Sequence, residues 1–205
     1  MDKKIRVGIN GFGRIGRAFF KVALERDDIE VVGINDLGDV HNLAYLLQYD
    51  TVYRVSHFDV HAEVHEDSKE QYLVIEGEKD MRVKVVQEKD PAAIPWGALE
   101  VDIVVESTGL FVAYDKASAH LKGGAKAVVI SAPAKGGEDA SVKGETILLG
   151  VNEEKFGTCQ VTSNASCTTN ASSPVIAILD AAIGVEKAIL NTVHSYTASQ
   201  GIVDG

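Results

Sequence analysis

The sequence predicts a doubly wound α/β fold built on a parallel sheet, followed by the beginning of an α+β domain. Two observations carry the α/β part of this prediction. Short apolar, β-branched segments alternate with amphipathic helical segments, and a glycine-rich turn joins the first strand to the first helix. A helix between two buried strands acts as a crossover, which produces parallel pairing. We expect the first domain to span residues 1–165 and an incomplete second domain to occupy residues 166–205.

Composition and charge exclude several classes of protein. The 205 residues include 20 Lys and Arg against 30 Asp and Glu, a net charge of −10, which argues against a nucleic-acid partner. No apolar run approaches the ~18 residues of a membrane span. The first residues lack the pattern of a signal peptide, and two cysteines make no disulfide framework. We therefore expect a cytoplasmic protein without a membrane or nucleic-acid partner.

The first 36 residues predict a strand, a helix and a second strand. Residues 5–10 (IRVGIN) are short, apolar and β-branched. In the following helix, one predicted apolar face contains Ile15, Phe19, Val22 and Ala23. Residues 29–36 (IEVVGIND) form another apolar strand that ends in an acid. Together these segments make a βαβ unit.

The next hundred residues continue the alternation. We expect a helix in 40–50, an edge strand in 56–67 and a hairpin in 71–86, and then a strand, a helix and a strand in 101–109, 113–125 and 126–134. The polar residues 134–145 form the longest predicted loop. His120 is expected on a surface helix. In 56–67, alternating His, Asp and Glu residues allow a metal site, but a half-buried strand with a solvated face explains them better.

The second domain begins with a helix in residues 167–184, which has Ser, Thr and Asn at its start and glycine at its end. Residues 185–200 then begin as a long strand. The chain ends soon afterwards, so this strand has no later neighbour to pair with. We interpret the sequence as incomplete and expect residues 186–197 to be poorly ordered in isolation.

The turn after the first strand has the spacing of a dinucleotide-binding motif. It reads Gly11-Phe12-Gly13-Arg14-Ile15-Gly16, follows a strand, opens a helix and lies 20 residues before Asp36 (36 − 16 = 20). The glycines allow a tight turn, close approach of a pyrophosphate and helix packing, and the helix N-terminus favours the phosphate charge. Asp36 would accept hydrogen bonds from a ribose and repel a 2′-phosphate. The motif predicts a Rossmann domain that binds NAD rather than NADP, although a glycine-rich turn with a solvated acid is the alternative.

Cys167 is a candidate nucleophile, in the segment SNASCTTN where a capping sequence enters a helix. The positive end of a helix lowers the pKa of a thiol and enriches the reactive thiolate. Histidine is the usual partner that activates a thiol, and His194 is the histidine in an apolar segment closest to this helix. From these residues alone, an inert buried cysteine with a structural histidine is the favoured interpretation, and the nucleophile is the alternative. Cys159 is expected to pack in a strand.

Several segments together resemble a known family. GINGFGRIGR, VESTG, ISAPAK, SNASCTTN and TVHSYTASQ, in this order, closely resemble phosphorylating glyceraldehyde-3-phosphate dehydrogenase over essentially all 205 residues. The separation of Cys167 and His194, 194 − 167 = 27, also fits that family. The resemblance implies NAD-dependent oxidation of glyceraldehyde 3-phosphate through a cysteine thioester. Inorganic phosphate then releases 1,3-bisphosphoglycerate, a step of glycolysis and gluconeogenesis, and the family is usually homotetrameric.

The resemblance also implies roles for individual residues. Cys167 is the nucleophile and His194 its base. The backbone of Arg14 and Ile15 contacts the pyrophosphate, and Asp36 binds the ribose. Lys89 lies near the adenine and Ser131 near the nicotinamide. Ser166, Thr168 and Thr197 bind phosphate groups, although capping would also explain these hydroxyl residues.

Three hypotheses follow from the sequence. The chain is the first part of a phosphorylating dehydrogenase, an NAD-binding module without turnover, or an erythrose-4-phosphate dehydrogenase with related motifs. It departs from the family at Ala171, where a second cysteine is frequent, and at Gly201, where a basic residue is common. The isolated 205-residue polypeptide is expected to bind NAD weakly and to turn over negligibly.

Overall fold

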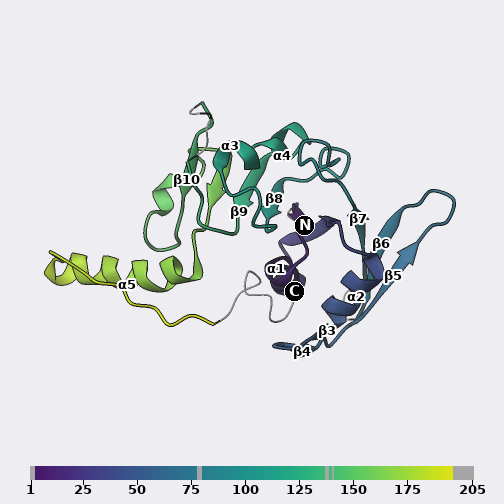
Figure 1. The fold of residues 1–205 in the computed structure, drawn as a ribbon, viewed down its shortest axis with the longest axis horizontal. Helices are drawn as coiled ribbons and strands as arrows, with labels where there is room; N and C mark the ends of the chain where they lie inside the picture. Colours follow the sequence, from purple (N-terminus) through teal and green to yellow (C-terminus); the bar gives the residue numbers. More distant parts are fainter. Residues whose placement is uncertain (1–2, 78–79, 137–138, 140, 196–205) are drawn as a thin grey trace. The chain divides into compact units, whose positions relative to one another are not determined.

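The computed structural model describes residues 3–77, 80–136, 139 and 141–195, which fall in two compact units, Met1–Ser166 and Cys167–Gly205. Figure 1 shows the succession of the elements along the chain. The described strands are β1 (Ile5–Asn10), β2 (Ile29–Asn35), β3 (Tyr49–Asp50), β4 (Arg54–Val55), β5 (Asp59–Val64), β6 (Gln71–Glu76), β7 (Met81–Val86), β8 (Ile103–Glu106), β9 (Ala127–Ile130), β10 (Gly144–Thr146) and β11 (Val161–Ser163). The described helices are α1 (Arg14–Leu24), α2 (Val40–Gln48), α3 (Tyr114–Ala117), α4 (Ala119–Lys122), α5 (Cys167–Ile183) and a 3-10 helix, Glu153–Lys155.

The sheet of the first unit confirms the predicted doubly wound α/β fold. Its described strands run in the order β10-β11-β9-β8-β1-β2-β7-β6-β5. Pairing is parallel from β10 to β7, and β5 and β6 are added antiparallel at one edge. The chain first builds outward from β1 through β2 and later returns to place β8 on the other side of β1. The sheet therefore reverses its winding between β1 and β8, where ligands of such folds bind.

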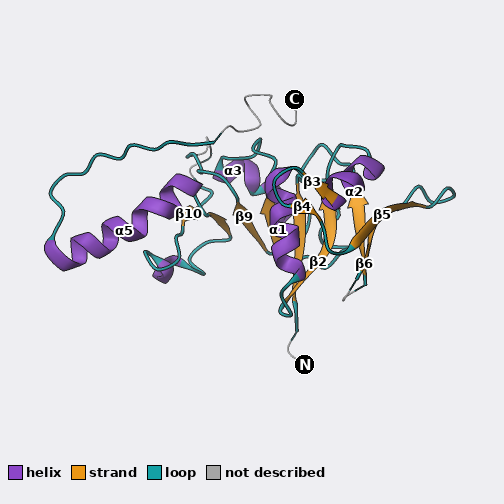
Figure 2. Cartoon of the chain, turned by 90° about the horizontal axis from the view of Figure 1, so that it is seen from below, coloured by secondary structure: helices purple, strands orange, loops and turns teal. Residues whose placement is uncertain are grey.

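Each face of the sheet carries its own apolar core. One core contains Phe20 of α1 and Leu47 of α2 packed against strand residues such as Ile9 and Ile34. Figure 2 shows α1 lying along the strands on that face. On the other face, Trp96 and Ala117 pack with Val104, Val128 and other residues of β8, β9 and β11. Burying both faces explains why the parallel strands are apolar along most of their length.

The buried face of α1 differs from the predicted one. Phe19 and Ala23 do pack against the core, but Ile15 and Val22 are 57% and 59% exposed. Gly16 and Phe20 face the sheet together with Ala23, at helical spacing. The reason is Gly16: a Cβ there would lie 2.2 Å from the carbonyl oxygen of Gly11, so this glycine must turn toward β1 and sets the rotation of the helix.

The predicted position of His120 is also wrong. The expected single helix in 113–125 is two short helices, α3 and α4, and His120 on α4 is fully buried. Its ring lies between Trp96 and Glu106 and hydrogen-bonds both side chains. Periodicity alone missed this position because a polar residue that has buried partners carries no apolar signal.

In the second unit, α5 has the predicted bounds within one residue. Gly184 follows it at φ +76, and its N–H bonds the Asp180 carbonyl, a glycine ending of the kind predicted. The predicted strand is wrong for the described residues 185–195, which form no strand. Strand formation requires a hydrogen-bonded neighbour, and the described part of this unit offers none. Residues 196–200 of that prediction lie outside the described residues.

Candidate functional site

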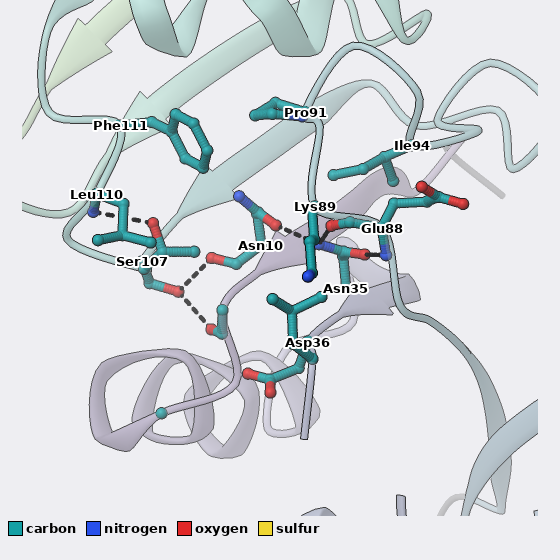
Figure 3. Close-up of a pocket in the computed structure, with 14 residues that line it drawn as sticks. Asn10, Asn35, Asp36, Glu88, Lys89, Pro91, Ile94, Ser107, Leu110 and Phe111 are labelled. Atoms are coloured by element: carbon teal, nitrogen blue, oxygen red, sulfur yellow. Dashed lines mark hydrogen bonds between the residues drawn. The ribbon is translucent and has the colours of Figure 1, made fainter. Parts of the chain in front are cut away.

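A pocket of about 320 Å³ lies at the carboxyl ends of β1 and β2. It brings together four residues predicted from the sequence to bind a cofactor: Gly11, Gly13, Asp36 and Lys89. Figure 3 shows apolar side chains of Pro91, Ile94 and Phe111 on the side of the pocket away from Asp36. The pocket therefore combines an apolar wall with a carboxylate and a glycine-rich turn.

The glycine-rich turn leaves its backbone open to the pocket. Gly11 has φ +88, and a Cβ there would lie 2.8 Å from the Thr108 nitrogen, so glycine is required. A Cβ on Gly13 would meet nothing within 4 Å, which is open space at the N-terminus of α1. This open space gives a pyrophosphate room to approach helix N–H groups, so the residues present fit a dinucleotide.

Asp36 holds the turn and the next loop together. Its two carboxylate oxygens accept hydrogen bonds from the Phe12 N–H at 2.6 Å and the Gly38 N–H at 2.8 Å. Each carboxylate oxygen has more than one acceptor direction, so both can also accept from a ribose hydroxyl. The negative charge at this position disfavours a 2′-phosphate.

The remaining predicted cofactor residues lie outside this pocket. Arg14 and Ile15 begin α1, and the Ile15 side chain is 57% exposed. Gly16 is buried under the turn. Ser131 follows β9, where its hydroxyl donates to the Glu106 carbonyl at 3.0 Å. These positions leave the proposed roles of the backbone at Arg14 and Ile15, and of Ser131, as predictions.

Sequence reasoning missed several residues that line the pocket. Their position in the sequence was an available signal. Most of them end a buried strand or follow one closely, and ligands of doubly wound folds bind at these strand ends. The missed residues include Asn10, Asn35, Glu88, Ser107, Thr108 and Phe111.

In the second unit, Cys167 and His194 lie side by side. The Cys167 Sγ atom is 3.0 Å from His194 Nε2, and both side chains are exposed. His194 Nδ1 lies 2.6 Å from the Ser195 carbonyl oxygen, which can only accept. The Nδ1 atom therefore carries a proton, and Nε2 is the atom that can take the proton of the thiol.

This geometry favours the charged pair. The hydrogen bond with His194 lowers the pKa of the Cys167 thiol from its ordinary 9.0, and the Thr168 backbone N–H lowers it further. In turn, the hydrogen bond with Cys167 raises the pKa of His194 above 6.5, and the Ser195 carbonyl adds to that effect. A thiolate beside an imidazolium is the reactive form of a cysteine nucleophile.

These two shifts predict the pH dependence of alkylation by iodoacetamide. Because the pKa of Cys167 is lowered, its thiolate should persist below pH 9.0 and disappear only as pH falls through the lowered value. His194→Gln should move the midpoint of the rate profile upward and slow alkylation at pH 7. The rate is followed by mass spectrometry in a Cys159→Ser background, so that one thiol remains. A profile unchanged by His194→Gln would contradict the pairing.

The predicted substrate residues lie around this pair in sequence. Ser166 ends the first unit, and Thr168 is the second residue of α5. The carbonyl of Thr168 accepts from the Ser172 hydroxyl, a contact within the helix. Thr197 lies outside the described residues. The phosphate-binding roles of these three residues therefore remain predictions.

Several further features bear on the type of site. Among the described residues, no three His, Cys, Asp or Glu side chains are arranged to hold a metal ion. In β5, Glu63 accepts from Arg82 at 2.9 Å and contacts His65 at 2.6 Å, so these side chains interact with one another at the surface.

None of the helices in the described ranges has the length and apolarity needed to cross a membrane. Cys159, expected inside a strand, is half-buried just before β11.

The doubly wound sheet, its glycine-rich turn and the acid at the end of β2 define a dinucleotide-binding protein. Comparison with known families is more specific. Residues 5–114 match the family model "Glyceraldehyde 3-phosphate dehydrogenase, NAD binding domain", and residues 166–205 match the C-terminal domain of the same family. The chain belongs to the glyceraldehyde 3-phosphate dehydrogenase family, an oxidoreductase family, and NAD is the cofactor of the matched domain.

Individual relatives agree with this assignment. The chain is 48% identical over 203 residues to a glyceraldehyde-3-phosphate dehydrogenase of Streptomyces coelicolor. It is 47% identical over 202 residues to glyceraldehyde-3-phosphate dehydrogenase 1 of Bacillus subtilis, and 44% over 201 residues to a cytosolic one of Trypanosoma brucei brucei. Each match covers 98% of this chain and 56% of the relative. The chain thus spans little more than half the length of the proteins it resembles.

Proposed function

We propose that the protein catalyses NAD-dependent oxidative phosphorylation of glyceraldehyde 3-phosphate to 1,3-bisphosphoglycerate, a reaction of glycolysis and gluconeogenesis. The observation that carries this proposal is the 3.0 Å contact between Cys167 Sγ and His194 Nε2 in a chain of this family. The pairing supplies a thiolate and a proton carrier, which are the two groups that oxidation of an aldehyde through a thioester requires.

The proposed chemistry begins at Cys167. Its thiolate attacks the aldehyde carbon, and the C=O bond becomes a C–O bond in a thiohemiacetal. His194 Nε2 first donates its proton to the developing oxyanion and then removes the hydroxyl proton as the C–H electron pair departs. NAD, when bound, supplies the acceptor for that hydride. The product on Cys167 is a thioester, which retains the energy of oxidation.

The second half-reaction releases the product. A phosphate oxygen attacks the thioester carbon, the C–S bond breaks, and the Cys167 thiolate returns. We propose that the Cys167 N–H and His194 stabilise the oxyanions of both half-reactions. Ser166, Thr168 and Thr197 would bind phosphate groups of the substrate and of inorganic phosphate. The hydroxyl donors that these residues carry suit that role.

For the cofactor, we propose that Gly11, Gly13, Gly16 and the backbone of Arg14 and Ile15 accommodate the pyrophosphate. Asp36 would bind the adenosine ribose, Lys89 would lie near the adenine, and Ser131 near the nicotinamide. The open space at Gly13 and the acceptor directions of Asp36 support the first two assignments.

The role of Asp36 predicts a change in cofactor preference. Asp36→Asn keeps one of the two acceptor oxygens, loses the backbone hydrogen bond of the other and removes the charge that repels a 2′-phosphate, so NAD should bind more weakly and NADP less unfavourably. We expect the ratio of the two dissociation constants to change by about tenfold or more. Calorimetric titration with each nucleotide measures it.

Asp39→Asn is the matched control for this experiment. Asp39 caps α2 by accepting from the N–H groups of His41 and Asn42, and asparagine caps equally well. This change removes a nearby charge that does not line the pocket, so the ratio should stay within about twofold of the unchanged chain. An equal change in both variants would refute a specific role for Asp36.

The two alternative functions differ from the proposed one: the first has another substrate, and the second has no turnover. NADH formation is measured with glyceraldehyde 3-phosphate and with erythrose 4-phosphate, each with inorganic phosphate, in a chain extended to the length of its relatives. We expect the first substrate to be preferred. Preference for the second would identify an erythrose-4-phosphate dehydrogenase, and NAD binding without either activity would identify a binding module. We further propose a cytoplasmic homotetramer, in keeping with the family resemblance.

A further inference from the structure

The residues assigned above leave one buried acid without a role. Glu106, at the end of β8, is 1% exposed. The sheet register pairs Asn10 with Asn35 on one side and with Glu106 on the other. The three side chains therefore form a row across the carboxyl ends of β2, β1 and β8. Asn10 and Asn35 line the cofactor pocket, while Glu106 contacts residues that do.

On one side of this row, the indole of Trp96 fixes the proton position of His120. An indole N–H can only donate, and Trp96 Nε1 lies 3.0 Å from His120 Nδ1. His120 Nδ1 must therefore accept, and its ring proton must sit on Nε2. That atom donates to Glu106 Oε2 at 2.9 Å. His120 is accordingly a neutral donor.

On the other side, a backbone N–H fixes the two asparagines. The Glu88 N–H donates to Asn35 Oδ1 at 2.8 Å, so the Asn35 amide nitrogen faces Asn10 and donates to its Oδ1 at 2.7 Å. The Asn10 amide nitrogen is then the atom that faces Glu106 Oε2, at 2.5 Å. Neither amide can be reversed without placing two donors together.

Thr108 supplies the remaining contacts of the carboxyl group. Its backbone N–H lies 2.8 Å from Glu106 Oε1, and its hydroxyl oxygen lies 2.5 Å from the same atom. That hydroxyl accepts from the Leu110 N–H at 3.0 Å and donates to Glu106. Glu106 thus meets four donors. Four donors around one carboxyl group favour its ionised form.

We propose that Glu106 is an anionic positioning residue of the cofactor pocket, which holds Asn10 and Thr108 in the orientations that shape the pocket. This inference rests on the proposed binding of NAD there. Thr108 also approaches Gly11, since a Cβ on that glycine would lie 2.8 Å from the Thr108 nitrogen. The carboxylate of Glu106 therefore links the ends of β1 and β8, the two strands between which the sheet reverses.

Glu106→Gln tests this proposal. Glutamine has nearly the same shape, but its NH₂ group must replace one carboxylate oxygen and face donors that cannot reverse. We expect its NAD dissociation constant, measured by calorimetry, to rise at least about tenfold. Val128→Ala is the matched control: Val128 is buried on the neighbouring β9, in the apolar core on the same face, and does not line the pocket. It should lose stability and keep its NAD affinity within about twofold.

A second pair of variants tests the proposal even if Glu106→Gln does not fold. His120 touches Glu106 without lining the pocket. His120→Leu removes one donor and should weaken NAD binding about threefold or more, whereas His120→Gln can still donate to Glu106 and should restore much of the affinity. In the unchanged chain, ¹⁵N NMR should show His120 as the neutral Nε2–H form.

The outcomes separate this inference from the proposed function. Unchanged NAD affinity in folded Glu106→Gln or His120→Leu would overturn the positioning role while leaving NAD binding in place. Equal loss in Val128→Ala would show an effect of stability alone, and an Nδ1–H or charged His120 would overturn the hydrogen-bond assignment. If the unchanged chain does not bind NAD, the proposed function fails and this inference fails with it.

Discussion

Replacing the Cys167 sulfur by oxygen, as Cys167→Ser, should abolish aldehyde oxidation and leave NAD binding intact. A serine hydroxyl is not ionised by an adjacent histidine in this pairing, whereas the hydrogen bond with His194 lowers the pKa of the thiol. We expect turnover, measured as NADH formation with glyceraldehyde 3-phosphate and phosphate, to fall by on the order of 10⁴-fold or more. The assay uses a chain extended to the length of its relatives.

Cys159→Ser is the control for that variant. Cys159 is half-buried, and its thiol donates to the Val161 carbonyl at 3.2 Å, a contact that a hydroxyl can replace. Its activity should therefore stay close to that of the unchanged protein. Substantial oxidation by Cys167→Ser would show that another group attacks the aldehyde, and loss of NAD affinity in the same variant would show that the change is not confined to the chemistry.

The second prediction with a large effect concerns two glycines of the same turn, which should respond differently to substitution by alanine. Gly16→Ala should destabilise the first unit, because the new Cβ would lie 2.2 Å from the Gly11 carbonyl oxygen and backbone cannot yield cheaply there. We expect the free energy of unfolding to fall by at least about 3 kcal/mol, measured by urea denaturation followed by circular dichroism. Binding of NAD is lost with the turn.

Gly13→Ala should act on binding alone. A Cβ at this position meets no atom within 4 Å, and Gly13 has φ −70, which alanine adopts readily. Alanine is a weaker helix N-cap than glycine, which lowers the free energy of unfolding by about 1 kcal/mol. It also restricts the unfolded chain, which raises the free energy of unfolding by about the same amount, so stability should change little. The methyl group would occupy the space proposed for the pyrophosphate, and the NAD dissociation constant should rise about tenfold or more. Unchanged affinity would place the cofactor elsewhere.

The sequence was sufficient for the fold of the first unit because its signals are local. Apolar β-branched segments, the spacing of Gly11 to Gly16 and the acid at 36 each depend on a few consecutive residues. The rotation of α1 was not predictable from periodicity, since the contact of Gly16 with Gly11 outweighs the burial of Ile15 and Val22. The strand predicted after residue 184 failed for a related reason, since strand pairing depends on distant partners.

The same distinction applies to the candidate site. The glycines, Asp36, Cys167 and His194 were found from motifs, and the structure adds the pocket around the first set and the 3.0 Å contact in the second. Glu106 and His120 were missed because Asn10 and Trp96 lie 96 and 24 residues from them and they lie 14 residues from each other, and a polar residue in a buried network has no periodic signature. A sequence scan for polar residues that end apolar strands would have found Asn10, Asn35 and Glu106.

The proposed mechanism depends on acylation of Cys167, which mass spectrometry can detect directly. A chain extended to the length of its relatives is mixed with glyceraldehyde 3-phosphate and NAD without inorganic phosphate, quenched in acid and digested. We expect a 3-phosphoglyceroyl group on the peptide that contains Cys167, and its loss when phosphate is added before quenching. NADH formation without any acyl group on Cys167, or an acyl group on a different residue, would contradict the mechanism.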